Sequence, residues 1–191
     1  MEKLILILFL VVLFSCTEIK QNPGILAENP PKQTSLLQPK YWILDGFHFT
    51  AVTNFELKAK VLGKKSYSYG TESEISPYDL ALGWGSMSDQ AIVDKFDISQ
   101  SSRWYFWSVK SYPIPKKEIE ISSSNMHIIP ANEEIEDALD DLLVGEIIYL
   151  KGYLVSVSKN NGWHWKSSLS RNDTGNGACE VVWVEKLLRI K

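Results

Sequence analysis

Several residue types are scarce in this 191-residue chain, and each shortage excludes a class of protein. Two cysteines are too few for a disulfide-stapled scaffold, and neither the Cys-x-x-Cys nor the His-x-x-x-His spacing of a structural zinc site occurs. Basic residues are not in excess either, since 20 Lys and Arg against 23 Asp and Glu give a net charge of −3. Nucleic acid is therefore a poor partner for this chain, and a polybasic patch for membrane binding is also lacking.

The sequence has one long apolar run, from Leu4 to Phe14, and this run is too short to cross a bilayer. A transmembrane helix needs about 20 apolar residues. Lys3 precedes the run, and Ser15 and Cys16 follow it. A short positive start, an apolar stretch of this length and a small residue at its end are typical of an export signal.

The end of this signal, Leu13-Phe14-Ser15-Cys16, resembles the lipobox of bacterial lipoproteins. The resemblance implies that residues 1–15 are a signal peptide removed by signal peptidase II, and that Cys16 is acylated. Several acyl chains on one residue hold a protein stably in a membrane. We therefore expect a lipid-anchored location in the bacterial cell envelope; the alternative is a secretory signal cleaved elsewhere, which leaves Cys16 free.

Residues 16–40 have the composition of a tether, because they hold four of the eight prolines and no aromatic residue. Proline-rich segments favour extended backbone and serve as spacers. All seven tryptophans lie between Trp42 and Trp183. We expect residues 16–40 to be a lipidated tether and residues 41–191 to form a single β-rich globular domain of ordinary size.

Strand patterns dominate the expected domain. Phe55, Leu57, Ala59 and Val61 alternate with polar residues, as in a half-buried strand. Asn161-Gly162 predicts a two-residue type I′ turn between two strands. Further extended segments are expected at residues 103–109, 118–129, 146–158 (with a bend or bulge at Gly152) and 181–190.

Two helices fit between these strands. Ser88 can cap the first, which carries Ala91, Ile92 and Phe96, and Asn132 can cap the second, which has an apolar stripe. Short strands, few helices and a closing meander predict a mainly β (α+β) fold: a small antiparallel OB-like barrel or, alternatively, a strongly twisted sheet, with one or two short helices.

Four stretches are rich in Trp, Gly, His and Asn. They are LALGWGSMSDQ (80–90), ISQSSRWYFW (98–107), NMHIIPA (125–131) and the segment 162–185, with SSLSRNDTGNGACEVVWVE. In these stretches the chain is similar to a family of uncharacterised bacterial envelope proteins, over roughly positions 50 to 186. The resemblance implies a domain type and an envelope location, and it carries no mechanism.

Cys179 is the one nucleophilic thiol of the expected domain, which also contains His127 and His164. A Cys–His pair can perform acyl transfer if the imidazole reaches the sulfur. The loop amides of Gly175 and Gly177 would then form an oxyanion hole. The structural alternative is that Cys179 is a buried core residue and His127 a hydrogen-bonded interior histidine.

The segment around Cys179 also contains oxygen ligands suited to a hard cation, among them Asp173 and Glu180. The spacing of these residues matches no EF-hand loop. The alternative is a tight connection in which glycines permit positive φ angles. We therefore expect neither a metal nor another cofactor.

Aromatic residues are the more promising ligand-binding candidates. Arg103, Tyr105 and Trp107 share one face of a predicted strand, and Trp163 and Trp165 share one face of the predicted hairpin. Aromatic platforms bind sugars, peptides and cations. The alternative is a tryptophan-rich core.

The sequence as a whole favours an envelope lipoprotein whose domain is a non-catalytic binding or assembly module, with an envelope protein or glycan as partner. The alternative is a Cys–His hydrolase or acyltransferase that acts on envelope material, and a purely structural tether is a third possibility.

Overall fold

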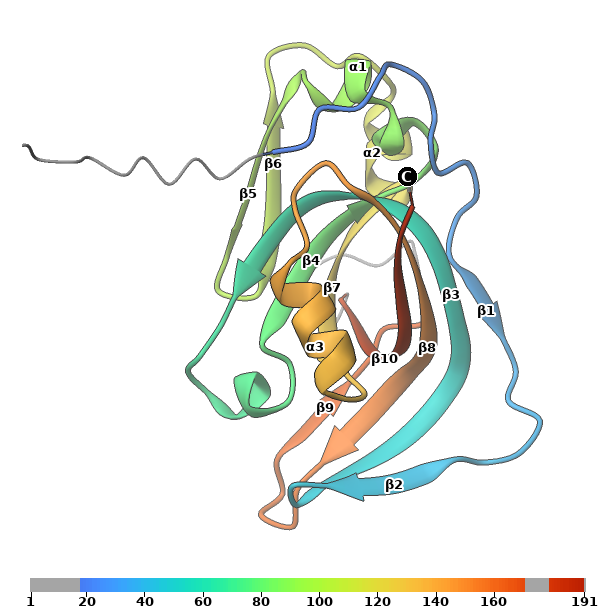
Figure 1. Ribbon diagram of the computed structural model, residues 1–191, viewed down its shortest axis with the longest axis vertical. Helices are drawn as coiled ribbons and strands as arrows, with labels where there is room; N and C mark the ends of the chain where they lie inside the picture. Colours follow the sequence, from blue (N-terminus) through green and yellow to red (C-terminus); the bar gives the residue numbers. More distant parts are fainter. Residues whose placement is uncertain (1–17, 171–178, 191) are drawn as a thin grey trace, which may run out of the picture.

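The computed structural model describes residues 18–170 and 179–190 (Figure 1). The strands are β1 Lys32–Thr34, β2 Tyr41–Leu44, β3 Phe47–Ser66, β4 Tyr78–Gly83, β5 Phe96–Ser101, β6 Trp104–Val109, β7 Ser123–Pro130, β8 Ile147–Ser158, β9 His164–Lys166 and β10 Glu180–Ile190. The α-helices are α1 Gln90–Val93, α2 Lys116–Ile121 and α3 Glu133–Asp140, and short 3₁₀ turns span Thr71–Glu74 and Gly85–Ser88.

Five strands are hydrogen-bonded in the ring order β3–β4–β7–β10–β8, and β8 also pairs with β3. β7 and β10 run parallel, whereas the other neighbours in the ring are antiparallel. Along the chain, α3 lies between the third and fourth strands of the ring. This is the arrangement of the OB fold, a five-stranded Greek-key barrel. The prediction of a mainly β (α+β) fold with a small OB-like barrel is confirmed, except that the barrel is not wholly antiparallel, because β7 and β10 run parallel.

The interior of the ring is the main hydrophobic core. Phe55, Leu57, Ala59 and Val61 of β3 all point into it, so the predicted alternation is confirmed. α3 crosses one end of the ring and adds Ile135 to the same core (Figure 1).

Gly152 of β8 lies where two backbones approach closely. The pairing of β10 with β8 shifts by one residue between Val184 and Lys186, opposite Gly152. A Cβ atom at Gly152 would lie 1.8 Å from the carbonyl oxygen of Trp183. The irregularity predicted at this glycine is confirmed, and only glycine leaves room for it.

The helix caps follow the prediction in one case of two. Asn132 caps α3, since its Oδ1 accepts a hydrogen bond from the Ile135 amide at 3.0 Å. α1 is capped by Asp89, whose carboxylate accepts from the Ala91 amide at 2.9 Å. The predicted cap, Ser88, is wrong because its hydroxyl is engaged elsewhere.

The first helix is shorter than predicted, and the segment 118–129 is extended only from Ser123 onward. α1 has a single turn, and Phe96 belongs to β5. α2 occupies the start of the segment expected to be extended, and β7 begins only at Ser123. Pro115 is the N-cap of α2, and its carbonyl accepts from the Glu118 amide at 2.9 Å, while Ile119 is fully buried and holds the helix in place.

The chain between β4 and β7 forms a second layer outside the ring. β5 and β6 make a separate two-stranded hairpin in this layer. A smaller hydrophobic cluster, with Ala81, Met87 and Ile119, joins this layer to the barrel. The hairpin therefore covers part of the outer side of β4.

The predicted type I′ turn at Asn161-Gly162 is wrong. The Lys159 carbonyl accepts from the Gly162 amide at 3.1 Å, and the Lys159 amide donates to the Trp163 carbonyl at 2.9 Å. A type I′ turn requires a positive φ at both central residues. Gly162 has a φ of 89°, but the φ of Asn161 is not positive. The connection is a three-residue loop with glycine in the left-handed position.

Residues 18–34, here called the N-terminal segment, lie along the barrel. The Ile19 amide donates to the Val144 carbonyl at 2.8 Å, and β1 pairs with β3. Ala27 is completely buried in the main core, and its amide donates to the Ser88 hydroxyl at 3.0 Å.

The predicted tether is therefore wrong for the N-terminal segment, and the folded unit begins before residue 41. The segment is proline-rich, but its amides and carbonyls find partners on the barrel, and this offsets the entropy of ordering it. The signal and Cys16 lie outside the described residues. Within residues 18–170 and 179–190, no helix is long and apolar enough to span a membrane.

Candidate functional site

Polar residues occupy the outer side of β4 and β7, where the strands alternate with core residues. Leu80 of β4 and Met126 of β7 point into the ring. Asp79, Asn125 and His127 therefore point outward, yet their exposed fractions are only 0, 4 and 5%. Buried polar side chains of this kind need partners, and here they bind one another.

Asp79 is the centre of this group. Its Oδ1 accepts from Arg103 Nη1 at 2.8 Å and lies 2.9 Å from His127 Nδ1. Its Oδ2 accepts from Asn125 Nδ2 at 3.2 Å. A fully buried carboxylate is stable only with such charged and polar partners. We call these four residues, with Tyr67 and Trp165, which contact them, the Asp79 cluster.

Arg103 reaches the cluster from the turn between β5 and β6. Ser102 and Arg103 both have left-handed backbone, with φ values of 50° and 68°. The Arg103 amide donates to the Tyr67 hydroxyl at 2.9 Å, and its carbonyl accepts from Asn125 Nδ2 at 3.2 Å. This strained turn is therefore tied to the barrel at both backbone groups.

The Arg103 guanidinium lies between two aromatic rings. Its Cζ is 4.2 Å from the centre of the Tyr67 ring and 5.8 Å from that of Trp165. Nη2 is buried and has no hydrogen-bond acceptor in the described part of the chain. An unpaired buried donor of this kind is costly, and the Arg103 side chain as a whole is 19% exposed.

Burial, together with the nearby charge of Asp79, raises the pKa of the Tyr67 hydroxyl. Tyr67 therefore stays protonated at neutral pH. The His127 ring lies 4.8 Å from that of Trp165, so the imidazole is packed as well as hydrogen-bonded. The interior, hydrogen-bonded histidine expected as the alternative at position 127 is what the geometry shows.

The five predicted ligand-binding residues do not form one platform. Arg103 and Trp165 meet at the Asp79 cluster, and Trp163 lies 6.3 Å from Trp165, centre to centre. Tyr105 and Trp107 instead pack into the hydrophobic cluster between the hairpin and the barrel. Burial raises the pKa of Tyr105 to about 12.

Both hairpin tryptophans are half-buried, and His164 between them is exposed, as strand alternation predicts. Trp163 packs edge-on against Phe47 at 5.5 Å, and its indole Nε1 donates to Glu72 at 3.3 Å. Both rings therefore pack against the protein and remain partly exposed at the surface.

The predicted Cys–His pair gains no support from the described hydrogen bonds. His127 is directed to Asp79, and His164 lies 3.4 Å from the Gly162 carbonyl oxygen. Cys179 is half-buried at the start of β10. The glycines expected to form an oxyanion hole lie outside the described residues.

Of the two predicted cation ligands, Asp173 lies outside the described residues. Glu180 is 1% exposed and accepts from the Ser124 hydroxyl at 2.6 Å, next to the Asp79 cluster along β7. Across residues 18–170 and 179–190, no three His, Cys, Asp or Glu side chains gather as a metal site would require.

Several members of the site were not predicted from the sequence. Asp79, Asn125, Tyr67 and the neighbouring Gln100, whose amide donates to Asn125 Oδ1 at 2.7 Å, were not singled out. A signal was present, because Asp79 interrupts the otherwise apolar stretch YDLALG. A charged residue inside a buried strand indicates a paired or functional site.

A separate cleft of about 400 Å³ lies between β3, β5 and the N-terminal segment. Its charged lining includes Glu18, Lys20, Lys60, Lys65 and Asp94. The cleft borders the Asp79 cluster at Gln100, which lines it and donates to Asn125, and its lining residues Glu18 and Lys20 belong to the N-terminal segment.

Comparison with known proteins adds nothing to this geometry: no protein-family model, no curated protein and no solved structure matches the chain.

Proposed function

We propose that this chain is an exported lipoprotein of the bacterial cell envelope, anchored through an acylated Cys16, and that its barrel is a non-catalytic binding or assembly module. Support for the anchor comes from the lipobox-like Leu13-Phe14-Ser15-Cys16 after an apolar run of signal-peptide length.

The observation that carries the binding role is the position of the Asp79 cluster. OB barrels hold oligonucleotides and oligosaccharides on the outer side of their second and third strands, with help from two adjoining loops. Here those strands are β4 and β7. Tyr67 lies in the connection from β3 to β4, and Trp165 in the connection from β8 to β10. A likeness of fold alone does not assign a ligand, so the chemistry of the residues must support one separately.

The chemistry favours a glycan. A sugar offers hydroxyl and carboxylate oxygens as acceptors for the exposed part of the Arg103 guanidinium, whose side chain is 19% exposed, and its apolar ring face can pack against aromatic rings such as Tyr67 and Trp165. The net charge of −3 disfavours a nucleic acid ligand on the same face. An envelope glycan is therefore the ligand we assign to this site, ahead of an envelope protein.

The first prediction concerns Arg103→Gln. The change removes a charge-assisted donor worth about 1.5–3 kcal/mol, so affinity for the ligand should fall at least about tenfold. Binding is measured by co-sedimentation with purified cell-wall glycan and by tryptophan fluorescence. Arg189→Gln is the matched control, because Arg189 pairs with Glu146 far along the sheet, at 2.7 Å.

Circular dichroism and thermal melts must show that both variants remain folded. Equal binding by the wild-type protein and both variants contradicts the assignment of the site. If the protein captures an envelope protein and ignores glycan, the binding role stands with a different ligand. Release of products that stops in Cys179→Ala would favour the hydrolase or acyltransferase instead.

A further inference from the structure

The beginning of the N-terminal segment is fixed to the barrel by buried groups. Gln90, 4% exposed, accepts from the Gln21 amide at 3.0 Å and from the Lys60 ammonium through the same Oε1. The Gln90 amide donates to Asp94 at 2.8 Å, and Asp94 also pairs with Lys20 at 2.6 Å. With the Ile19 amide bonded to the Val144 carbonyl, the segment is held from its second described residue onward.

Very little chain separates these contacts from the proposed anchor. Ile19 bonds to Val144, and Cys16 is only three residues earlier. Because consecutive residues advance by at most about 3.6 Å, the Cα atoms of Cys16 and Ile19 are at most about 11 Å apart. An acylated Cys16 lies at the membrane surface, so this part of the barrel must lie there as well.

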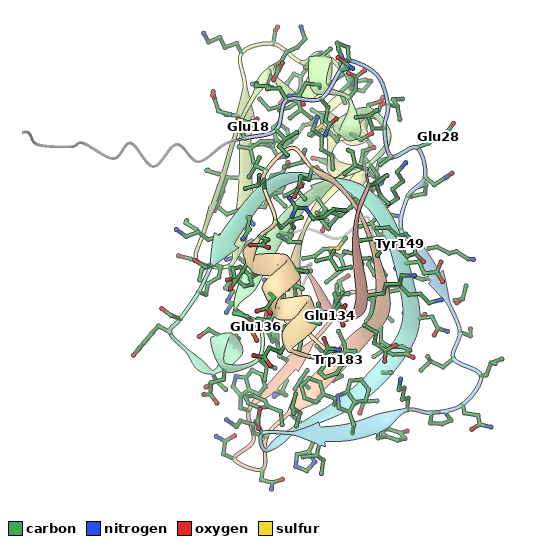
Figure 2. All side chains as sticks on the ribbon, viewed as in Figure 1. Glu18, Glu28, Glu134, Glu136, Tyr149 and Trp183 are labelled. Atoms are coloured by element: carbon green, nitrogen blue, oxygen red, sulfur yellow. The ribbon has the colours of Figure 1, made fainter. Side chains whose placement is uncertain are left out.

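We infer that the face around Glu18 lies against the lipid bilayer and that the β8–β9 turn points away from it. This inference rests on the proposed acylation of Cys16. Glu18 lies toward the upper end of the molecule, whereas the β8–β9 turn lies at the lower end (Figures 1 and 2). Lys65 and Ser99 are exposed and line the same cleft as Glu18, so they belong to the same face, which we call the near face because it is the one inferred to lie against the bilayer.

The partner of the near face is a bilayer rather than a protein, because the acyl chains keep this face at the membrane whatever its own affinity for lipid is. Lys65 adds a cation that suits anionic headgroups. The exposed Tyr41 and Ile43 of β2 lie at the opposite end, 69 and 66% exposed, and the inferred orientation turns them away from the bilayer (Figure 1).

The test measures the depth of two fluorescent probes in the full-length, acylated protein. Ser99→Cys and Asn161→Cys are each made with Cys179→Ala, labelled, and reconstituted in vesicles that contain lipids with a spin label at the headgroup. We expect the probe at residue 99 to be quenched several-fold more than the probe at residue 161. A flexible Gly/Ser linker of about 20 residues between Thr17 and Glu18 should remove most of this difference.

The outcomes separate the two proposals. If Cys16 incorporates a fatty-acid analogue and the two probes are quenched equally, or the probe at residue 161 is quenched more, the orientation is wrong while the lipoprotein assignment stands. If Cys16 takes up no label, the anchor and the orientation fall together. Unequal quenching that persists unchanged with the long linker shows that lipid affinity elsewhere on the surface orients the domain, which also overturns the inference.

Discussion

At the scale of single residues, the candidate site combines predicted and unpredicted side chains. Arg103 and Trp165 belong to separate aromatic stretches of the sequence, and the fold brings them to 5.8 Å. Alternation within a strand predicts which neighbours share a face, but it cannot predict which faces meet across strands. Asp79 and Asn125 join the site only through such long-range pairing of β4 with β7. Their positions therefore could not be predicted from local patterns.

Tyr105 was a predicted ligand residue, and Tyr105→Phe tests whether it belongs to the core instead. Burial raises its pKa to about 12, against about 10 in an unfolded chain. Between about pH 10 and 12 the unfolded chain loses a proton that the folded chain keeps. The free energy of unfolding therefore falls as the pH rises through this window, by on the order of 3 kcal/mol, and Tyr105→Phe should lack this contribution.

Urea denaturation of both proteins below and above this window gives the measurement. Taking the difference between the two proteins cancels the contributions of all other titrating groups to the pH dependence of the free energy of unfolding. Below the window the variant should be about as stable as the wild type, because among the described residues the buried Tyr105 hydroxyl makes only a weak contact, with Ser123. A variant with an unchanged pH dependence and weaker glycan binding would place Tyr105 on the ligand face.

At the scale of elements, the confirmed predictions are those in which a local rule decides the structure. Asn132 caps α3 because its side chain replaces a missing backbone partner three residues away. The prediction of a two-residue turn at Asn161-Gly162 is wrong because the register of β8 and β9 pairs Lys159 with Trp163, and this pairing leaves a three-residue loop. Ser88 is not the helix cap because its hydroxyl accepts a hydrogen bond from the N-terminal segment. In both failures a tertiary contact overrides the local preference.

Ser88→Ala should release the middle of the N-terminal segment. The Ser88 hydroxyl accepts from the amides of Leu26 and Ala27 at 3.1 and 3.0 Å and is itself fully buried. Its loss leaves two amides without this acceptor, which costs about 1–3 kcal/mol. Hydrogen exchange at Leu26 and Ala27 should become faster. Asn132→Ala is the control, because it costs about 1 kcal/mol in α3 and should leave those two amides unchanged.

If exchange at Leu26 and Ala27 is equally slow in Ser88→Ala and the wild type, Ser88 does not hold the segment. Faster exchange in both variants would mean that the segment opens only with the whole domain, and the local effect predicted for Ser88 would be wrong.

At the scale of the whole molecule, the OB-like barrel was predictable and its boundary was not. The order of strands and helices along the chain is a global pattern that few folds satisfy. The N-terminal segment has no aromatic residue and several prolines, so its composition indicates a spacer. Its attachment depends on Ala27 and on backbone groups, and neither leaves a signal in side-chain patterns.

Removing residues 1–34 decides whether this segment is part of the fold. The deletion takes Ala27 from the main core, removes the partner of Ser88 and exposes the edge of β3 that pairs with β1. A loss of about 3 kcal/mol is expected, which corresponds to a fall of about 10 °C in Tm for a domain of this size. The control lacks only residues 1–17 and should melt with an unchanged Tm when compared with the full chain in detergent. Identical melting of the two truncated proteins would restore the tether and remove the basis for a domain held close to the bilayer.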